Sequence, residues 1–378
     1  MNILRNIIIF TILILSSTLI TLSEESAIEL VKKGNILYNE GKVEEALDCY
    51  KRALEIEPNY VYGWYSRGLT LLSCKRYEEC LYCFEKVVEL NPSHELSWFN
   101  RGFALYKLGR LAEALEAFDK AIEIDPGDFE VWYHKGNLLS DMKKYEEAIK
   151  CYDITLTLSP EATNALYRKG LALYNIKNYK KSIECYDRIL EIFRKNSDHN
   201  YLFYPQETDV LYEKGLALEG INHVKEALDC YDRILTIDPN YVNVWIRKGE
   251  LLYIANEYLE STDPEDFKKS LPYYNKALEI EPDNIEALIW KGMTLRAMYR
   301  YEEAISCYDT VLKIDNKNIT ACYEKGVTLH CNGKYEEALK YFDKALELNS
   351  TDKIFVRLIN MLKEETLKAL NKNKKEYK

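Results

Sequence analysis

Two cysteines, Cys80 and Cys83, stand three residues apart with Cys74 nearby, and thiolates at such a spacing can share a zinc ion. The next candidate ligand, His94, lies eleven residues beyond Cys83, which is about 16 Å along a helix. Cys80 also stands where other parts of the chain have a small alanine, and Cys83 belongs to a series of regularly spaced cysteines. We therefore expect neither a metal site nor a cofactor.

The residues that could carry acid–base or nucleophilic chemistry form no recognisable motif. The sequence contains no zinc-protease pair, nucleophile elbow or glycine-rich phosphate loop. Acidic pairs are unavoidable among 61 Asp and Glu residues, so they do not by themselves indicate catalysis. The histidines are scattered at His94, His134, His199, His223 and His330. We expect a protein that is not an enzyme.

The charge distribution argues against nucleic acid as a partner. The 378 residues carry a formal net charge of −10. The basic residues are spread along the chain and form no single positive stripe, which is the usual footprint of nucleic-acid binding.

The elements that hold these residues follow one pattern, which recurs about every 34 residues. Within residues 95–128, apolar side chains fall three and four apart, which is helical spacing. Gly109 interrupts this pattern and Asp125-Pro126 closes it, so we expect two short helices joined by a tight turn. Gly102 has no Cβ and would let the two helices approach closely. Such a hairpin cannot bury both of its faces alone, so neighbouring hairpins must stack.

A Lys-Gly or Arg-Gly pair marks every unit of the pattern and a proline closes most of them. The paired glycines are Gly34, Gly68, Gly102, Gly136, Gly170, Gly215, Gly249, Gly292 and Gly326. The closing residues are Pro58, Pro92, Pro126, Pro160, Pro239 and Pro282, with Asn316 and Ser350 in the last two units. From Ala27 to Asp352 this order of residues resembles the tetratricopeptide repeat family. The resemblance implies an all-α fold, a right-handed α-solenoid of nine helical hairpins.

We divide the chain into nine repeats and a C-terminal segment. Two insertions interrupt the array, at residues 197–207 and 257–266, and either a binding role or drift in a tolerant loop would explain them. Asp263 and Pro264 predict an earlier start of the second helix there, and Pro272 predicts a kink in that helix. The repeats cover residues 27–60, 61–94, 95–128, 129–162, 163–196, 208–241, 242–284, 285–318 and 319–352.

Residues 353–378 keep a helical pattern and end in a lysine-rich tail. Apolar side chains recur at Ile354, Leu358, Ile359 and Leu362. Because the last repeat of an array exposes an apolar face, we expect this segment to form a capping helix with a polar outer surface.

Six cysteines stand at the same place in their units, just before the aromatic residue of the second helix. Equivalent places in stacked hairpins should lie roughly 10 Å apart, which exceeds the 7 Å limit for bridged Cα atoms. We therefore expect free thiols, which favour a reducing compartment. The six are Cys49, Cys83, Cys151, Cys185, Cys230 and Cys307.

Residues 1–23 differ from the rest of the chain. Arg5 precedes an apolar run from Ile7 to Leu22 of about 16 residues, against roughly 20 for a typical membrane span. This segment resembles a secretory signal peptide or membrane anchor, and a helix that caps the first repeat is the alternative. Because Arg5 precedes the run and acidic residues follow it, the repeats would lie beyond the cytoplasm. We expect a membrane-anchored or secreted protein, with a cytoplasmic one as the alternative.

The first helices of the hairpins should line a concave groove. Tyrosine recurs there at the fifth and twelfth places of the units, and its large apolar ring with a polar tip suits a binding surface. Arginines at the sixth place could pair with a carboxylate of the ligand. The predicted peptide-binding residues are Tyr65, Phe99, Tyr106, Tyr133, Tyr167, Arg168, Tyr174, Tyr212, Arg247, Tyr253 and Tyr323.

One known binding mode of the family is not expected here. Some members hold the acidic tails of heat-shock chaperones in a carboxylate clamp, with lysine at the fifth place and asparagine at the ninth. Asn35 and Asn137 stand at the ninth place, but the fifth place holds Val31 and Tyr133. We therefore predict no chaperone-tail binding.

The leading functional hypothesis is a non-enzymatic protein–protein interaction scaffold that holds peptide segments in a tyrosine-lined groove, at or beyond a membrane. The alternative is a cytoplasmic assembly or regulatory adaptor that binds its partners through the inserted loops.

Overall fold

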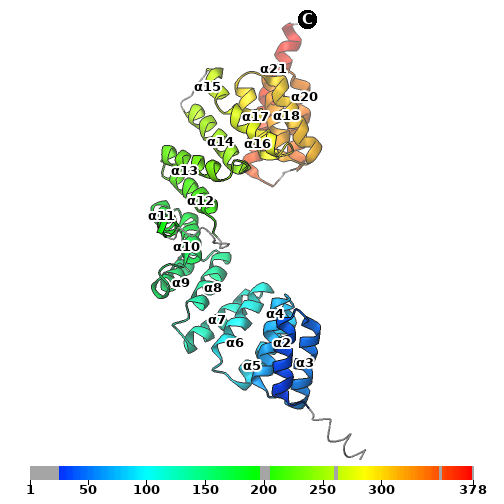
Figure 1. Ribbon diagram of the computed structural model, residues 1–378. Helices are drawn as coiled ribbons and strands as arrows, with labels where there is room; N and C mark the ends of the chain where they lie inside the picture. Colours follow the sequence, from blue (N-terminus) through cyan, green and yellow to red (C-terminus); the bar gives the residue numbers. More distant parts are fainter. Residues whose placement is uncertain (1–24, 196–204, 259–262, 349–350, 377–378) are drawn as a thin grey trace, which may run out of the picture. The chain divides into compact units, whose positions relative to one another are not determined.

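The computed structural model describes residues 25–195, 205–258, 263–348 and 351–376, and within these ranges every regular element is a helix (Figure 1). The chain divides near Ile192 into two compact units. The first unit holds α2 (Ala27–Asn39), α3 (Val43–Ile56), α4 (Val61–Ser73), α5 (Tyr77–Leu90), α6 (Glu95–Lys107), α7 (Leu111–Ile124), α8 (Phe129–Asp141), α9 (Tyr145–Leu158), α10 (Thr163–Asn175) and most of α11 (Tyr179–Lys195).

The second unit continues the same arrangement. It holds α12 (Glu207–Gly220), α13 (Val224–Ile237), α14 (Val242–Tyr258), α15 (Pro264–Lys268), α16 (Leu271–Ile280), α17 (Ile285–Ala297), α18 (Tyr301–Ile314), α19 (Ile319–Cys331), α20 (Tyr335–Leu348) and α21 (Lys353–Glu376). Within each unit, helices that follow one another along the chain pack as antiparallel hairpins, such as α8 with α9 and α17 with α18. These helices confirm the predicted all-α array of stacked hairpins.

The helix ends follow from local sequence. At the start of α2, the hydroxyl of Ser26 accepts from the backbone N–H of Glu29, and the Glu29 carboxylate accepts from the backbone N–H of Ser26. Asn284 caps α17 and Asn318 caps α19, because their side-chain oxygens accept from the backbone N–H groups of Ala287 and Ala321. Acidic residues in the first turn of most second helices, such as Glu146 in α9, complement the positive end of the helix dipole.

The glycine of each Lys/Arg-Gly pair lies against an aromatic ring of the second helix. A Cβ built on Gly102 would lie 2.8 Å from Cδ1 of Phe118, which is closer than real Cβ contacts. The contact agrees with the prediction that Gly102 lets the two helices approach closely because it has no Cβ. The same contact recurs at all nine paired glycines, each of which the structure describes. The rings are Tyr50, Phe84, Phe118, Tyr152, Tyr186, Tyr231, Tyr274, Tyr308 and Phe342. Each ring is almost completely buried.

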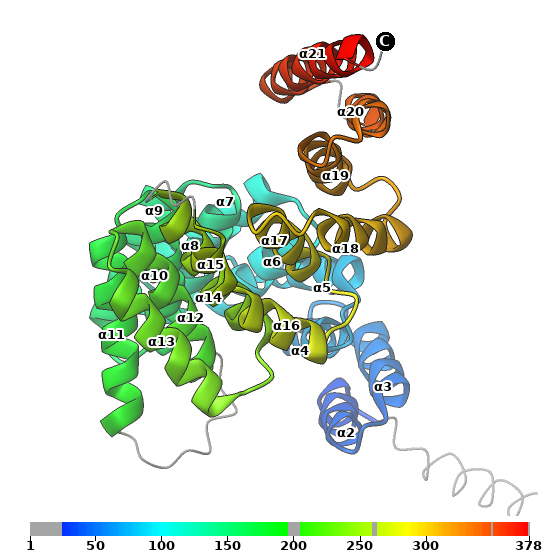
Figure 2. The ribbon, with the colours of Figure 1, turned by 90° about the horizontal axis from the view of Figure 1, so that it is seen from above.

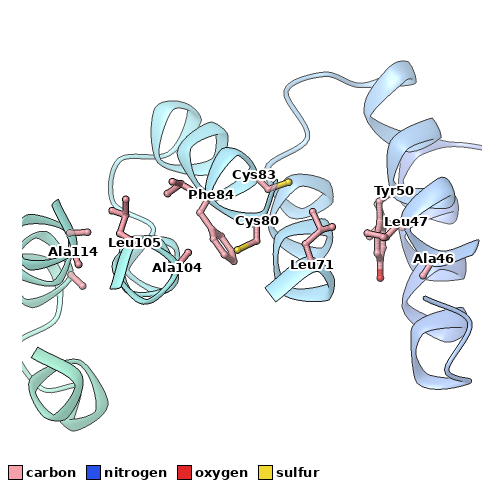
Figure 3. Close-up of a cluster of buried hydrophobic side chains, with 14 of the residues drawn as sticks. Ala46, Leu47, Tyr50, Leu71, Cys80, Cys83, Phe84, Ala104, Leu105 and Ala114 are labelled. Atoms are coloured by element: carbon pink, nitrogen blue, oxygen red, sulfur yellow. The ribbon is translucent and has the colours of Figure 1, made fainter. Parts of the chain in front are cut away.

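The core continues from one hairpin to the next. Leu71 of α4, Phe84 of α5 and Ala104 of α6 belong to one cluster of buried side chains, part of which appears in Figure 3. Cys80 and Cys83 lie in the same cluster. The cluster explains how hairpins that cannot bury both faces alone are stabilised by their neighbours.

Tryptophan at the fourth place of a unit is hydrogen-bonded to the proline that closes the preceding unit. The indole Nε1 of Trp98 donates to the carbonyl oxygen of Pro92 at 2.8 Å. The same bond joins Trp64 to Pro58, Trp132 to Pro126 and Trp245 to Pro239. It fixes the loop between two hairpins against the helix that follows.

Ion pairs also connect successive hairpins. Lys135 Nζ lies 2.5 Å from Asp119 Oδ1, and Lys169 Nζ lies 2.6 Å from Asp153 Oδ1. In each pair the lysine belongs to the Lys/Arg-Gly pair of one hairpin, and the aspartate lies on the second helix of the hairpin before it. Lys248 with Asp232 and Lys325 with Asp309 repeat this arrangement in the second unit.

In eight of the hairpins, the described residues of the turn include one with a left-handed backbone. Gly109 has a φ of +76° there, as its interruption of the helical pattern indicates. Lys143 takes the equivalent place in the next hairpin with a φ of +60°, although it carries a side chain.

The second insertion differs from the prediction. Asp263 caps α15 by accepting from the backbone N–H of Glu265, and Pro264 is its first residue, as the sequence predicts. The expected kink at Pro272 is wrong, because α15 ends at Lys268 and Pro272 lies in the first turn of a separate helix, α16. The backbone N–H groups of the first helical turn have no partner within the helix. Proline has no such N–H group, so it can stand in this turn without loss of a hydrogen bond. Most of the first insertion, residues 197–204, lies outside the described residues.

Helix α21 packs beside α19 and α20 at the C-terminal end of the second unit (Figures 1 and 2). This position confirms the predicted capping helix. Its predicted polar outer surface is wrong in part, because Ile354 and Leu358 are exposed whereas Ile359 is buried.

The apolar run at residues 7–22 lies outside the described residues. In the part of the chain that the structure describes, no helix combines the length and apolar character needed to cross a membrane.

Candidate peptide-binding surface

The predicted peptide-binding residues all lie on first helices of hairpins. Within each compact half of the chain, the first helices of successive hairpins are neighbours. Examples are α2 with α4 and α6 with α8 in the first half, and α14 with α17 and α17 with α19 in the second. The residues are Tyr65 on α4, Phe99 and Tyr106 on α6, Tyr133 on α8, Tyr167, Arg168 and Tyr174 on α10, Tyr212 on α12, Arg247 and Tyr253 on α14, and Tyr323 on α19.

The rings at the fifth place pack against the second helix of their own hairpin. The centroids of Tyr133 and Tyr152 are 6.3 Å apart, and those of Phe99 and Phe118 are 6.1 Å apart. The second-helix ring that packs against the glycine, such as Tyr152, therefore also contacts the ring at the fifth place, such as Tyr133. Tyr167 is only 5% exposed, as is Tyr253 at the twelfth place, so these two offer little surface to a ligand.

The guanidinium of Arg247 is held by carboxylates of the same chain. Its Nε lies 3.1 Å from both carboxylate oxygens of Glu219, and its Nη1 donates to Glu250 at 2.6 Å. The hydroxyl of Tyr231 donates to the same Glu219 at 2.5 Å. The side chains of Glu219 and Glu250 are almost entirely buried. A ligand carboxylate would have to compete with both for Arg247.

Tyr106 is also engaged within the chain, because its hydroxyl donates to Asp141. Burial, followed by this hydrogen bond and the negative charge of Asp141, raises the pKa of Tyr106 to about 12. The phenol is therefore neutral at pH 7, and its ring supplies partly buried apolar surface to the same layer of helices.

The asparagines at the ninth place form hydrogen bonds inside their own hairpins. Asn35 Oδ1 accepts from the hydroxyl of Tyr50 at 2.8 Å, and Asn137 Oδ1 accepts from Tyr152 at 2.9 Å. Their side-chain oxygens thus bridge the first and second helices of each hairpin.

A set of exposed apolar side chains lies on the first helices of the first three hairpins. Ile28 and Tyr62 are each 50% exposed and Leu96 is 46% exposed, and all three stand at the second place of their units. Tyr38 and Leu69 add exposed apolar surface at the twelfth and ninth places. We call these five residues the N-terminal apolar surface.

The second-place residues are not among the predicted binding residues, although the sequence contains a signal for them. The second, fifth, ninth and twelfth places are separated by three or four residues, so they share one face of the first helix. Ile28, Tyr62 and Leu96 are apolar at the second place, whereas the fourth unit has Glu130 there. That run of three apolar residues marks the surface in the sequence.

His134 lies in an aromatic environment next to this surface. Its ring centroid is 5.3 Å from that of Phe99 and 5.4 Å from that of Phe103. Burial, assisted by the positive charge of Lys107, lowers the pKa of His134 to about 4. The imidazole is therefore neutral at pH 7 and adds to the apolar character of α8.

The cysteines are free, as predicted, and the ten of them all lie in the described residues. Burial raises the pKa of Cys80 to about 12 and that of Cys83 to about 11. Neither thiol is ionised at pH 7. Among the described residues, no three His, Cys, Asp or Glu side chains are grouped so that they could hold a metal ion.

The stacked hairpins define a helical-repeat protein of the α-solenoid class. Four models of the tetratricopeptide repeat match the sequence, and together they cover most of it. One matches residues 61–94, 96–128, 163–196 and 319–352, and the others match residues 34–73, 117–150 with 273–306, and 208–241. The chain belongs to the tetratricopeptide repeat family.

One curated relative is an uncharacterized protein of Methanocaldococcus jannaschii, MJ0572. It is 39% identical over 62 residues, which are 16% of this chain and 70% of the relative.

Several solved structures are similar to this chain at low identity. Yeast Tom70 is 14% identical, with a TM-score of 0.45 and coverage of 91% of this chain and 96% of Tom70. Pseudomonas aeruginosa PilF is 17% identical, with a TM-score of 0.46 and coverage of 57% and 93%. MamA from Desulfovibrio magneticus RS-1 is 21% identical, with a TM-score of 0.45 and coverage of 47% and 99%.

Proposed function

We propose that this protein is a non-enzymatic scaffold that binds an extended or helical peptide segment of a partner protein along the first helices of its hairpins. The observation that carries the proposal is the N-terminal apolar surface. Ile28, Tyr62 and Leu96 recur at one place in three stacked hairpins, so a single apolar segment could contact all three. Aromatic and aliphatic side chains aligned in this way suit a peptide that presents apolar anchors at regular spacing.

The aromatic residues at the fifth place of the repeats have a supporting role in this proposal. Tyr65, Phe99 and Tyr133 are half-buried, so each would contribute one edge of its ring beneath the bound segment. The nine repeats, with the bounds given above, would provide further binding positions along the array. Arg247 of the second unit is held by Glu219 and Glu250, so we do not propose it as a ligand for an anionic peptide.

The test is an affinity capture from native lysate with the full chain as bait and three variants beside it. The first variant carries Ile28→Lys, Tyr62→Lys and Leu96→Lys. The matched control carries Ile56→Lys, Ile124→Lys and Leu158→Lys, which change side chains of comparable exposure on second helices. A partner lost from the first variant and kept by the control supports the proposal, and a partner kept by both overturns it.

The third variant carries Tyr133→Ala and Tyr174→Ala, which change half-buried rings on α8 and α10 of the first unit. If the groove extends beyond the first three hairpins, this bait also loses the partner. Loss from this bait alone would move the binding site away from the N-terminal apolar surface. Capture through the inserted loops, as the cytoplasmic adaptor hypothesis has it, would leave all three variants unaffected.

We also propose that residues 7–22 act as a signal peptide or membrane anchor, which would place the scaffold at or beyond a membrane. The apolar run after Arg5 supports this assignment. Fractionation of cells that express the full chain distinguishes the two compartments. A chain that is found in the soluble cytoplasmic fraction with its N-terminus intact would rule out the membrane assignment.

A further inference from the structure

Helix α21 has two apolar faces. On the inner face, Phe355, Ile359 and Leu362 pack against the last hairpin, and the ring centroid of Phe355 is 5.5 Å from that of Tyr323. On the outer face, Ile354, Leu358 and Met361 are 84%, 42% and 54% exposed. They are four and three residues apart, so they form one line along the helix. We call these three residues the outer stripe of α21.

The outer stripe is unusual for a helix that ends an array. Capping segments of repeat proteins have polar outer faces, because the exposed end must stay soluble. A continuous row of large apolar side chains on such a helix instead marks an interaction surface. The stripe therefore needs an occupant.

The charged residues that border the stripe indicate which occupant fits. Arg357 and Glu365 are both exposed, and each is four residues from Met361, on opposite sides of it. With a rise of 1.5 Å per residue, each lies about 6 Å from Met361 along the helix axis. A second α21 laid antiparallel, with the two Met361 side chains at the two-fold axis, would bring each Arg357 opposite Glu365 of the other copy.

We propose that two copies of this chain associate through antiparallel contact of their α21 helices. The outer stripes would meet at their Met361 ends, with the two Met361 side chains in contact, Leu358 of each copy next to Met361 of the other, and Ile354 at the edge of the interface. Two symmetry-related Arg357–Glu365 ion pairs would flank them and set the register. The apolar run at residues 7–22 is a less suitable occupant, because it contains no charged residue to pair with Arg357 or Glu365.

The first experiment measures the oligomeric state of the full chain by sedimentation velocity over a range of concentrations, in one buffer with a constant non-denaturing detergent. We expect a monomer–dimer equilibrium. The Leu358→Lys/Met361→Lys variant should dissociate at least about tenfold more readily. The control variant Ile237→Lys/Ile314→Lys changes side chains of 50% and 45% exposure in the same unit and should dimerise as the unaltered chain does.

The second experiment tests the antiparallel register by charge exchange. Arg357→Glu and Glu365→Arg should each weaken the dimer, because each places like charges opposite one another. The double variant Arg357→Glu/Glu365→Arg should restore the dissociation constant to within about threefold of the original. Circular dichroism with equal helical signal for all variants shows that the differences concern association.

Three results would overturn the proposal. One is a chain that stays monomeric at every concentration. Another is a dimer that is indifferent to the changes in the outer stripe, which would move the interface elsewhere, including to residues 7–22. The third is a double charge variant that remains as weak as the single ones, because the two helices would then not meet in the proposed antiparallel register.

Discussion

Gly136 of α8 lies directly under the ring of Tyr152 of α9, so that a Cβ built on the glycine would be 2.6 Å from Cε1 of the tyrosine. The ring is completely buried, and its hydroxyl donates to Asn137 on the facing helix. The glycine thus sets how closely the two helices of the hairpin approach.

Gly136→Ala should destabilise the protein, although alanine favours helix formation by about 1 kcal/mol. The added methyl group overlaps a buried ring that has no space to move, and overpacking of this kind costs about 1–3 kcal/mol. Urea denaturation followed by circular dichroism measures the net loss. In a Tyr152→Ala background the same change should be neutral or stabilising, and an equal cost in both backgrounds would contradict the steric explanation.

The buried imidazole of His134 makes stability depend on pH. Its pKa is about 4 in the folded chain, against about 6.5 when unfolded, so the unfolded state binds a proton first. The part of the free energy of unfolding that depends on a neutral His134 is fully present above pH 6.5, and it is lost as the pH falls toward 4. Between pH 7 and pH 5, it should decrease by about 1–2 kcal/mol.

Urea denaturation at pH 7 and pH 5 measures this loss. His134→Phe should remove that part of the pH dependence, because a phenyl ring fills the aromatic site without titrating. Phe129→Leu serves as the control, because it changes an exposed side chain of the same helix that does not titrate, and it should leave the pH dependence as it is. Equal slopes for His134→Phe and the unaltered chain would show that His134 titrates normally.

Glu219→Gln should destabilise the second unit by about 1–2 kcal/mol. The amide can still accept from Tyr231, but it no longer compensates the partly buried charge of Arg247, which then depends on Glu250 alone. Thermal unfolding measures the effect. Glu226→Gln alters an exposed carboxylate on the neighbouring helix α13 and should change stability little.

Lys143→Gly should stabilise the protein by up to about 1 kcal/mol, because a residue with a Cβ is strained at a φ of +60°. Gly109→Lys makes the reverse change at the equivalent turn and should cost a similar amount. Denaturant midpoints of both variants test the pair. If both changes shifted stability in the same direction, backbone strain would not be the cause.

The fold could be predicted because its determinants repeat. Gly102, Phe118 and Pro126 act within one hairpin or against the next, so one unit of sequence contains nearly all the information needed to place its neighbours. The error at Pro272 arose where the insertion removed that regularity, since α15 has no counterpart in another repeat and α16 is shorter than the other second helices.

The binding surface was harder to predict, because exposure depends on contacts between helices. The periodicity places Tyr167 and Ile28 on the same face of their helices, yet Tyr167 is buried and Ile28 is half exposed. Arg247 was expected to face a ligand, but Glu219 on the first helix of the preceding hairpin holds it instead. The spacing of residues shows on which face of a helix each one lies. It does not show which residues of the adjacent hairpins contact it.

The ion pairs between hairpins bear on how such a chain can change its length. Lys135 pairs with Asp119, and Lys169 pairs with Asp153 in the same way one repeat later. If residues 129–162 were lost together, Lys169 would lie opposite Asp119. The new boundary between two hairpins would then have the same lysine–aspartate ion pair. Duplication of those residues would likewise place a lysine opposite an aspartate at the new boundary between hairpins. Whole repeats can therefore be gained or lost in evolution without any compensating substitution in this ion pair.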